Sequence, residues 1–190
     1  AFMKEPMAMF LREHNPSNVQ YDEAVETFCI SLAGYCVATY VIGIGDRHND
    51  NVMLSKNGHL FHIDFGHFLG NFKSKFGFKR ERAPFVFTPD FAYVLGDKGS
   101  ENFERFISVC CQAYNILRQH SHEFINLFSL MLSTGIPELQ KEEDIYWLRH
   151  CLMLGLTDEQ AADHFTKQIY VALATRTTQV NNAVHIIAHS

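Results

Sequence analysis

Apolar residues at helical spacing run through most of the chain, and one short region of strand-like character interrupts them. Residues 21–42 (YDEAVETFCISLAGYCVATYVI) have acidic residues in the first turn, few helix breakers and Gly43 at the end, which are start and stop signals of a helix. Because its second half is apolar on all sides, we expect this helix to be buried in the middle of the domain. Pro6 and the turn-like segment 14–18 (HNPSN) predict a short helix and a loop before it.

The chain after residue 100 is also predicted to be helical. The expected helices cover residues 102–119, residues 122–133 and roughly residues 138–154, and another opens at Thr157, which fits a capping box with Gln160.

Two short apolar runs between these helical regions predict a β-hairpin. Residues 51–55 (NVMLS) and 59–64 (HLFHID) flank Asn57-Gly58, a pair that tolerates the positive φ angles of a tight hairpin turn. A small antiparallel strand pair among many helices predicts an α+β, mainly α fold. Residues 67–90 lack sustained periodicity and predict a loop longer than about 15 residues, a length that usually carries function.

Composition limits the classes of protein that the chain can belong to. With 190 residues, 47% of them hydrophobic, we expect one globular domain or one lobe of a larger one. The net charge of −5 gives no general case for nucleic-acid binding, so any basic site must be local. The cysteines are odd in number, form no CxxC pair and lie in apolar segments, which predicts reduced core residues of an intracellular protein. They are Cys29, Cys36, Cys110, Cys111 and Cys151.

We expect neither a secretory signal nor a membrane-spanning helix. The first residues contain no basic region followed by a long apolar run. The longest uncharged apolar run, residues 32–45, is shorter than the roughly 20 residues that a bilayer-spanning helix needs.

Oxygen-bearing side chains mark both ends of the predicted hairpin. Asn51 precedes the first strand and Asp64 ends the second, so a tight turn brings both to one edge of the domain. Carboxylate and amide oxygens suit Mg²⁺, and Asp64 opens a DFG tripeptide, so the pair resembles the metal-holding pair of a kinase and indicates phosphoryl transfer. The loop before it carries Asp46, Arg47 and His48, in an order that differs from the His-Arg-Asp of ordinary protein kinases.

Two motifs identify the branch of kinases that this chain resembles. The segments 45-GDRHNDN-51 and 61-FHIDFGH-67 closely resemble the catalytic and activation segments of the phosphoinositide 3-kinases and their relatives. The resemblance extends through residues 33–48, 70–85 and 164–181, so it covers nearly the whole chain.

The resemblance implies the C-terminal lobe of a protein-kinase-like catalytic domain over residues 1–190. It places the catalytic loop at about 43–51, the activation loop at about 62–88 and C-terminal helices over 101–190. The family carries a glycine-rich phosphate loop and a strand lysine in its N-lobe, and neither precedes the motif here. We therefore expect the N-lobe to be absent from this chain and the fragment alone to have little or no turnover.

The same resemblance assigns nucleotide and metal roles to residues of the hairpin. Asn51 and Asp64 would hold Mg²⁺, and Asp64 would also contact the ATP. Met53, Phe61 and Ile63 would form the floor of the adenine pocket, where an aromatic base needs apolar faces.

Histidines are the expected general bases. His48 and His67 are both candidates, because an imidazole near its natural pKa accepts a proton from an inositol hydroxyl, and which of the two does so stays open. Asp46 and Arg47 complete the catalytic set, with Asp46 a candidate for orienting the loop or the acceptor.

The other histidines of the hairpin are expected to be structural. A zinc site formed by His59, His62 and His67 is the alternative, but their spacing matches no established zinc motif and the side chains alternate between strand faces.

Positive charge is concentrated directly after the DFG segment. Residues 73–82 carry five cations and one anion, a local charge of +4, whereas the rest of the chain carries 11 cations and 20 anions. Lysine and arginine form charge-assisted hydrogen bonds with phosphate oxygens, so we expect a lipid headgroup site here rather than a solvated charge run. Its residues are Lys73, Lys75, Lys79, Arg80 and Arg82.

By resemblance, this basic loop narrows the expected function to class I enzymes. These transfer the γ-phosphate of ATP, with Mg²⁺, to the 3-hydroxyl of phosphatidylinositol 4,5-bisphosphate. The implied partners are a phosphoinositide lipid at the membrane surface, the N-lobe and upstream domains, and a regulatory or adaptor subunit, with no nucleic acid. The implied location is the cytoplasm, with recruitment to the inner face of the plasma membrane.

Three other functions stay open. They are a phosphatidylinositol 3-kinase of another class, a protein kinase of the same superfamily, against which the basic loop argues, and a non-catalytic membrane-docking or regulatory module.

The last residues resemble the family's terminal helix, with Asn182 where many members have a tryptophan. Tryptophan favours the membrane interface, so its replacement predicts weaker engagement of a bilayer, although Val184, Ile186 and Ile187 still offer apolar contact. A helix merely packed on the lobe is the alternative.

Overall fold

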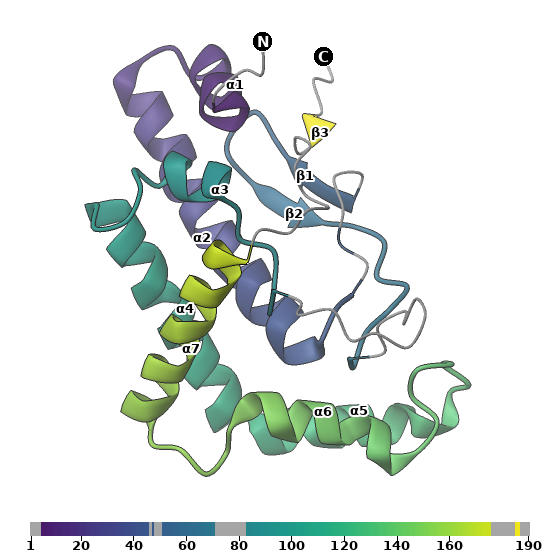
Figure 1. Ribbon diagram of the computed structural model, residues 1–190. Helices are drawn as coiled ribbons and strands as arrows, with labels where there is room; N and C mark the ends of the chain where they lie inside the picture. Colours follow the sequence, from purple (N-terminus) through teal and green to yellow (C-terminus); the bar gives the residue numbers. More distant parts are fainter. Residues whose placement is uncertain (1–4, 46, 48–50, 71–82, 176–184, 187–190) are drawn as a thin grey trace.

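Long helices make up most of the structure, and a small sheet lies along one side of the central helix (Figure 1). The computed structural model describes residues 5–45, 47, 51–70, 83–175 and 185–186. In chain order its elements are α1 (Pro6–His14), α2 (Asn18–Ile42), β1 (Val52–Leu54), β2 (Leu60–His62), α3 (Pro89–Val94), α4 (Glu101–Gln119), α5 (Ser121–Leu130), the 3-10 helix η2 (Met131–Ser133), α6 (Glu142–Leu152), α7 (Asp158–Ala174) and β3 (His185–Ile186). Figure 1 shows α2 running through the middle, with the strands on one side and α4 and α7 on the other. The predicted α+β, mainly α fold is confirmed.

The central helix α2 begins at Asn18, before the predicted Tyr21, because Ser17 caps it. The Gln20 backbone N–H donates to Ser17 Oγ at 3.2 Å, and the Ser17 N–H donates to the Gln20 side chain at 3.3 Å. This reciprocal pair is a capping box. At the other end Gly43, with φ of 64°, closes the helix in the left-handed conformation that glycine adopts without steric cost.

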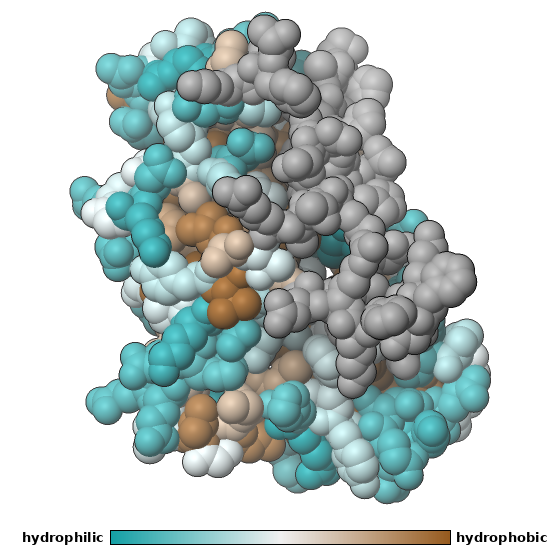
Figure 2. Space-filling view, viewed as in Figure 1, coloured by the Kyte–Doolittle hydropathy of each residue, from teal (hydrophilic) through white to brown (hydrophobic). Residues whose placement is uncertain are grey.

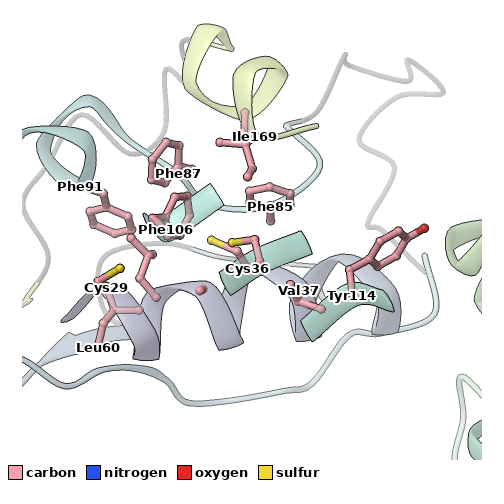
Figure 3. Packing of buried hydrophobic residues seen from close by; sticks show 14 of the residues in the cluster. Cys29, Cys36, Val37, Leu60, Phe85, Phe87, Phe91, Phe106, Tyr114 and Ile169 are labelled. Atoms are coloured by element: carbon pink, nitrogen blue, oxygen red, sulfur yellow. The ribbon is translucent and has the colours of Figure 1, made fainter. Parts of the chain in front are cut away.

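The helix α2 is also the core of the lobe. By length and composition alone it is long and apolar enough to cross a membrane, which the sequence prediction did not allow for, but half of its most apolar window is buried inside the protein. It packs on α4, which packs in turn on α7. Figure 3 shows Cys36 and Val37 of α2 and Phe106 of α4 in this interior with Phe85 and Ile169.

The cysteines belong largely to this core, as predicted. All five are free thiols, and only Cys111 is partly exposed. Burial raises the pKa of the Cys151 thiol to about 12 and that of Cys29 to about 11, where neighbouring Glu26 adds to the effect. These thiols are therefore protonated and unreactive at neutral pH.

The predicted hairpin is confirmed, with its register fixed by three cross-strand pairs. They are Val52 with His62, Met53 with Phe61, and Leu54 with Leu60. Its turn rests on α2, since a Cβ on Gly58 would overlap the backbone carbonyl of Ala24. The side chain of Asn15 donates to the Lys56 carbonyl at 2.8 Å and ties the turn to the end of α1.

The helix boundaries differ from the predictions in three further places. The segment 67–90 was predicted to be a loop, yet α3 begins at Pro89, because the Thr88 hydroxyl accepts the N–H of Phe91 and caps it. The helix predicted at 122–133 ends at Leu130 and continues only as η2. The helix predicted at 138–154 begins at Glu142, because the Asp144 carboxylate accepts the N–H groups of Gln140 and Lys141.

The predicted terminal helix is wrong for His185 and Ile186, which form β3. This strand runs parallel to β1, with His185 beside Met53 and Ile186 beside Leu54, so the sheet order is β2-β1-β3. The added strand satisfies backbone groups that β1 leaves open on its outer edge. The C-terminal helices that the sequence predicts over 101–190 therefore extend, within the described residues, only to Ala174. Asn182, Val184 and Ile187 lie outside those residues.

The described surface in the view of Figure 2 is mostly hydrophilic, with apolar residues gathered in a few patches between the polar ones. This distribution fits the expectation of a folded lobe with one interior.

Candidate active site

The two ends of the hairpin meet, as the sequence predicts. The N–H of Ile63 donates to the carbonyl of Asn51 at 3.0 Å, which extends the strand pairing by one step and places Asp64 beside the start of β1. Asn51 is 3% exposed, whereas the side chain of Asp64 lies at the surface. One carboxylate and one amide are hard oxygen donors, so this pair fits Mg²⁺, which takes few protein ligands.

No group of three or more histidine, cysteine or acidic side chains that could hold a metal occurs within the part of the chain that the structure describes. A metal held by Asn51 and Asp64 would have two protein ligands and would leave coordination positions for phosphate oxygens and water.

Asp64 has an unusual backbone conformation. Its φ of 58° is in the left-handed region, which is uncommon for a residue with a Cβ, although aspartate adopts it more readily than most. Such conformations cost about 1–3 kcal/mol and persist where the surroundings fix them, often at functional sites. The backbone here turns sharply at the first residue of the DFG tripeptide.

Arg47 fixes that turn from the catalytic loop. Its guanidinium donates to the carbonyl of Ile63 at 2.8 Å and to the carbonyl of Asp64, while its Nε donates to the carbonyl of Gly45 at 2.9 Å. It also lies 5.4 Å from the centre of the Phe65 ring. A planar fork of donors suits two neighbouring carbonyls, so Arg47 couples the catalytic loop to the DFG backbone.

A second set of contacts, which we call the seam, joins the segment after the DFG tripeptide (residues 67–70) to the segment that leads into the catalytic loop (residues 42–45). Residues 67–70 run beside residues 42–45, and three backbone hydrogen bonds connect them. They run from Gly45 N to His67 O (2.9 Å), from Leu69 N to Ile42 O (2.7 Å) and from Gly70 N to Gly43 O (3.2 Å). His67, a predicted catalytic residue, is thereby held next to the catalytic loop.

Trp147 of α6 covers this seam. Gly43 and Gly70 both have positive φ angles, 64° and 73°, and a Cβ on either would overlap the indole ring. Two glycines are therefore needed both for the backbone conformation and for the closeness of the tryptophan. Sequence reasoning missed Trp147, although it is the only tryptophan of the chain.

His67 has an acidic neighbour that the sequence did not predict. Its Nδ1 lies 3.6 Å from Oε1 of Glu138, and the two side chains are only 28% and 19% exposed. Glu138 lies in the turn before α6, far from His67 in sequence, and no motif connects the two positions.

The predicted adenine-pocket residues share one face of the hairpin. Met53 and Phe61 are cross-strand partners, and such partners point to the same side of a sheet. Ile63 follows Phe61 by two positions, so it continues on that side, and it is 41% exposed. Three apolar side chains on the face away from the core form a surface suited to an aromatic base.

His62 faces the opposite side and belongs to the core. Its ring stacks on Tyr35 at 4.9 Å, and its Nδ1 has no hydrogen-bond partner among the described residues. Burial, with a smaller contribution from Arg47, lowers the pKa of His62 to about 4, so it is neutral at physiological pH. His59 lies in the exposed turn, where its Nδ1 is 3.2 Å from the Asn57 side chain. Both positions fit the structural roles that the sequence predicts.

The remaining predicted residues lie outside the described part of the chain. They are Asp46 and His48 of the catalytic loop and the headgroup residues Lys73, Lys75, Lys79, Arg80 and Arg82. Their roles stay predictions from the sequence.

Comparison with known families agrees with the geometry of the site. Residues 1–141 match the family described as phosphatidylinositol 3- and 4-kinase. The chain belongs to this family. The match contains the hairpin, the seam with residues 42–45 and the turn that holds Glu138, so the phosphoinositide kinase predicted from the two motifs is confirmed at the level of the family.

Relatives within the phosphatidylinositol 3- and 4-kinase family are similar over almost the whole chain. Phosphatidylinositol 3-kinase 1 of Dictyostelium discoideum is 58% identical over 190 residues, and phosphatidylinositol 3-kinase 2 of the same organism is 61% identical over 186 residues. The human phosphatidylinositol 4-phosphate 3-kinase C2 domain-containing subunit beta is 50% identical over 190 residues. These matches cover 98–100% of the chain but only 10–12% of each relative.

Proposed function

We propose that this chain is the C-terminal lobe of a phosphatidylinositol 3-kinase that phosphorylates the 3-hydroxyl of phosphatidylinositol 4,5-bisphosphate. The observation that carries the proposal is the joined site: Arg47 holds the backbone at Asp64, and His67 pairs with the catalytic loop. The same edge of the lobe thus carries two proposed metal ligands, Asn51 and Asp64, the apolar face of the hairpin for the nucleotide, and the imidazole of His67. Such an edge supplies the positioning and electrostatic stabilisation on which phosphoryl transfer depends.

Each group has a role in this reaction. Asn51 and Asp64 would hold Mg²⁺, which neutralises charge on the nucleotide phosphates when it is bound. Met53, Phe61 and Ile63 would carry the adenine of ATP. His67, with His48 as the second candidate, would accept the proton of the inositol hydroxyl.

The lipid substrate is proposed from the charge of residues 73–82. Five cations with one anion suit a headgroup that carries several phosphates, and each charge-assisted hydrogen bond adds about 1.5–3 kcal/mol. From the resemblance to the phosphoinositide 3-kinases, we also propose that the parent protein acts from the cytoplasm at the inner face of the plasma membrane, with an adaptor subunit.

Phosphatidylinositol 4-phosphate is the second candidate substrate. A specific observation favours it: the human relative that is 50% identical is named for that lipid. A substrate with one ring phosphate fewer forms fewer contacts with cations. Activity on the 4-phosphate should therefore depend on fewer cations of residues 73–82 than activity on the 4,5-bisphosphate.

The test is lipid phosphorylation by the full-length parent on phosphatidylinositol, its 4-phosphate and its 4,5-bisphosphate, in wild type and in Asp64→Asn. Asp22→Asn, an exposed aspartate in the first turns of α2, is the matched control. Activity on the bisphosphate that disappears in Asp64→Asn and persists in Asp22→Asn would support the proposal. Activity that is confined to the monophosphate or to phosphatidylinositol would assign another class of enzyme. Activity on none of the three would favour a docking module.

A further inference from the structure

The contact between His67 and Glu138 brings together two anchored parts of the lobe. His67 is held through its backbone carbonyl, which accepts the N–H of Gly45 at 2.9 Å. The backbone of His67 is therefore held beside the catalytic loop, and the Nδ1 of its ring lies 3.6 Å from Oε1 of Glu138.

Glu138 is equally well fixed. The next residue, Leu139, is fully buried, and its N–H closes a turn on the carbonyl of Ile136 at 3.0 Å. The turn leads directly into α6, whose Trp147 packs on the glycines beside His67. The carboxylate and the imidazole thus belong to two elements that already pack against each other, and neither is a flexible surface side chain.

The chemistry of this pair selects one tautomer of the imidazole. An ionised carboxylate only accepts hydrogen bonds, so the neutral ring that faces it carries its proton on Nδ1 and leaves the lone pair on Nε2. The Nδ1 to Oε1 distance is long for a hydrogen bond, but catalytic contacts in a site without substrate commonly shorten when the substrate binds.

We propose that Glu138 is a positioning residue for His67, and this inference rests on the proposed function. Glu138 orients the ring and keeps Nε2 ready to accept a proton. As the 3-hydroxyl oxygen forms its bond to the γ-phosphorus, the bond from that phosphorus to the bridging oxygen of ADP breaks, and the hydroxyl proton moves to Nε2. The carboxylate then faces a positive imidazolium and stabilises it, in the way that a third group supports the base in other catalytic sites.

The experiment uses the full-length parent in single-turnover and steady-state lipid phosphorylation. The variants are Glu138→Gln, which keeps the shape but removes the charge, His67→Ala, and the two combined. Glu143→Gln, an exposed glutamate in the first turn of α6, is the matched control. We expect Glu138→Gln to lower kcat by about tenfold to a hundredfold with KM for ATP and lipid nearly unchanged. The control should behave as wild type.

The combined variant separates positioning from a structural role. If Glu138 acts through His67, the double variant is no slower than His67→Ala alone, because residues that work as a unit are not additive. Independent, multiplied losses would overturn the proposal. So would a Glu138→Gln enzyme with the kcat of wild type.

A second variant covers the chance that Glu138→Gln disturbs folding. Glu138→Asp keeps the charge on a shorter side chain and should recover part of kcat. Equal losses in the Gln and Asp variants, together with a lower unfolding temperature, would show a contact that only holds the fold, and this would overturn the proposal.

Failure of this inference can be told apart from failure of the proposed function. A wild-type parent that phosphorylates no lipid contradicts the proposed function itself. A parent that is active on lipid but unaffected by His67→Ala keeps the proposed function and removes the positioning role of Glu138.

Discussion

Arg47 donates a hydrogen bond to the backbone carbonyl of Asp64, so the catalytic loop directly holds the first residue of the DFG turn. The same guanidinium reaches the preceding carbonyl, and its Nε reaches its own loop. The left-handed conformation of Asp64 therefore has a specific support, so the placement of the carboxylate that we propose for the metal site depends on Arg47.

Lysine at position 47 should remove this support while keeping the charge. A lysine has no planar fork and cannot serve two neighbouring carbonyls at once, so we expect Arg47→Lys to lower kcat of the full-length enzyme by about tenfold to a hundredfold. Arg149→Lys, at an exposed position of α6, is the control and should be neutral. An Arg47→Lys enzyme with wild-type kcat would show that the turn at Asp64 holds without the arginine.

Alanine substitutions at three glycines distinguish two contributions to the loss of stability. One is the overlap of the new Cβ with Trp147, and the other is the strain of a positive φ angle. In Gly70→Ala the Cβ meets the indole at a φ of 73°, so we expect a loss of roughly 3 kcal/mol or more in stability. Gly99→Ala has a similar φ of 86° but open space, so its loss should be about 1–2 kcal/mol. Gly34→Ala lies inside α2 with open space and should gain about 0.5–1 kcal/mol.

Thermal unfolding of the complete catalytic domain measures this series. The expected order of midpoints is Gly34→Ala, wild type, Gly99→Ala and then Gly70→Ala. If Gly70→Ala and Gly99→Ala unfold at the same temperature, overlap with Trp147 adds nothing to the strain of the positive φ angle. That result would contradict close packing of Trp147 on Gly70.

His62 makes stability depend on pH. Its pKa is lowered to about 4 in the fold from about 6.5 in the unfolded chain, so the unfolded state binds the extra proton between these values. The contribution of neutral His62 to the free energy of unfolding is therefore fully present above about pH 6.5. It is lost as the pH drops towards 4, by roughly 3 kcal/mol in total. His62→Phe keeps a ring against Tyr35 and removes the titration. Its unfolding midpoint should fall less between pH 6.5 and 4.5, and an unchanged slope would contradict the assignment to His62.

The basic loop should decide which lipid the enzyme prefers. In Lys79→Ala/Arg80→Ala, activity on the 4,5-bisphosphate should fall at least about tenfold, because two charge-assisted contacts to phosphate are lost, while activity on phosphatidylinositol persists. Arg149→Ala/Lys167→Ala removes two exposed cations elsewhere and is the control. Equal losses on both lipids would exclude a role in headgroup recognition.

Local signals predicted much of the fold. The hairpin followed from Asn57-Gly58 between two apolar runs, and the burial of α2 followed from residues that are apolar on all sides. Two caps in the sequence mark the true starts of α2 and α3: Ser17 with Gln20, and Thr88 before Pro89. The periodicity of apolar residues does not reveal these caps, so it predicts a late start for α2 and no helix at α3.

Long-range relationships could not be predicted in the same way. No spacing rule connects His67 with Glu138, or Trp147 with Gly43, because these pairs form only when α6 packs on the catalytic segments. The left-handed backbone of Asp64 is likewise held by Arg47, a residue 17 positions earlier, and no local pattern indicates that contact. The strand β3 depends in the same way on the open edge of β1.

The support of the hairpin turn on α2 has a consequence for how much the length of this region can vary. At one end Gly58 rests on Ala24, and at the other His67 pairs with Gly45, just past the end of the helix. Because the chain is held at Gly58 and again at His67, a residue lost or gained between these two contacts would displace the turn at Asp64 from the start of β1.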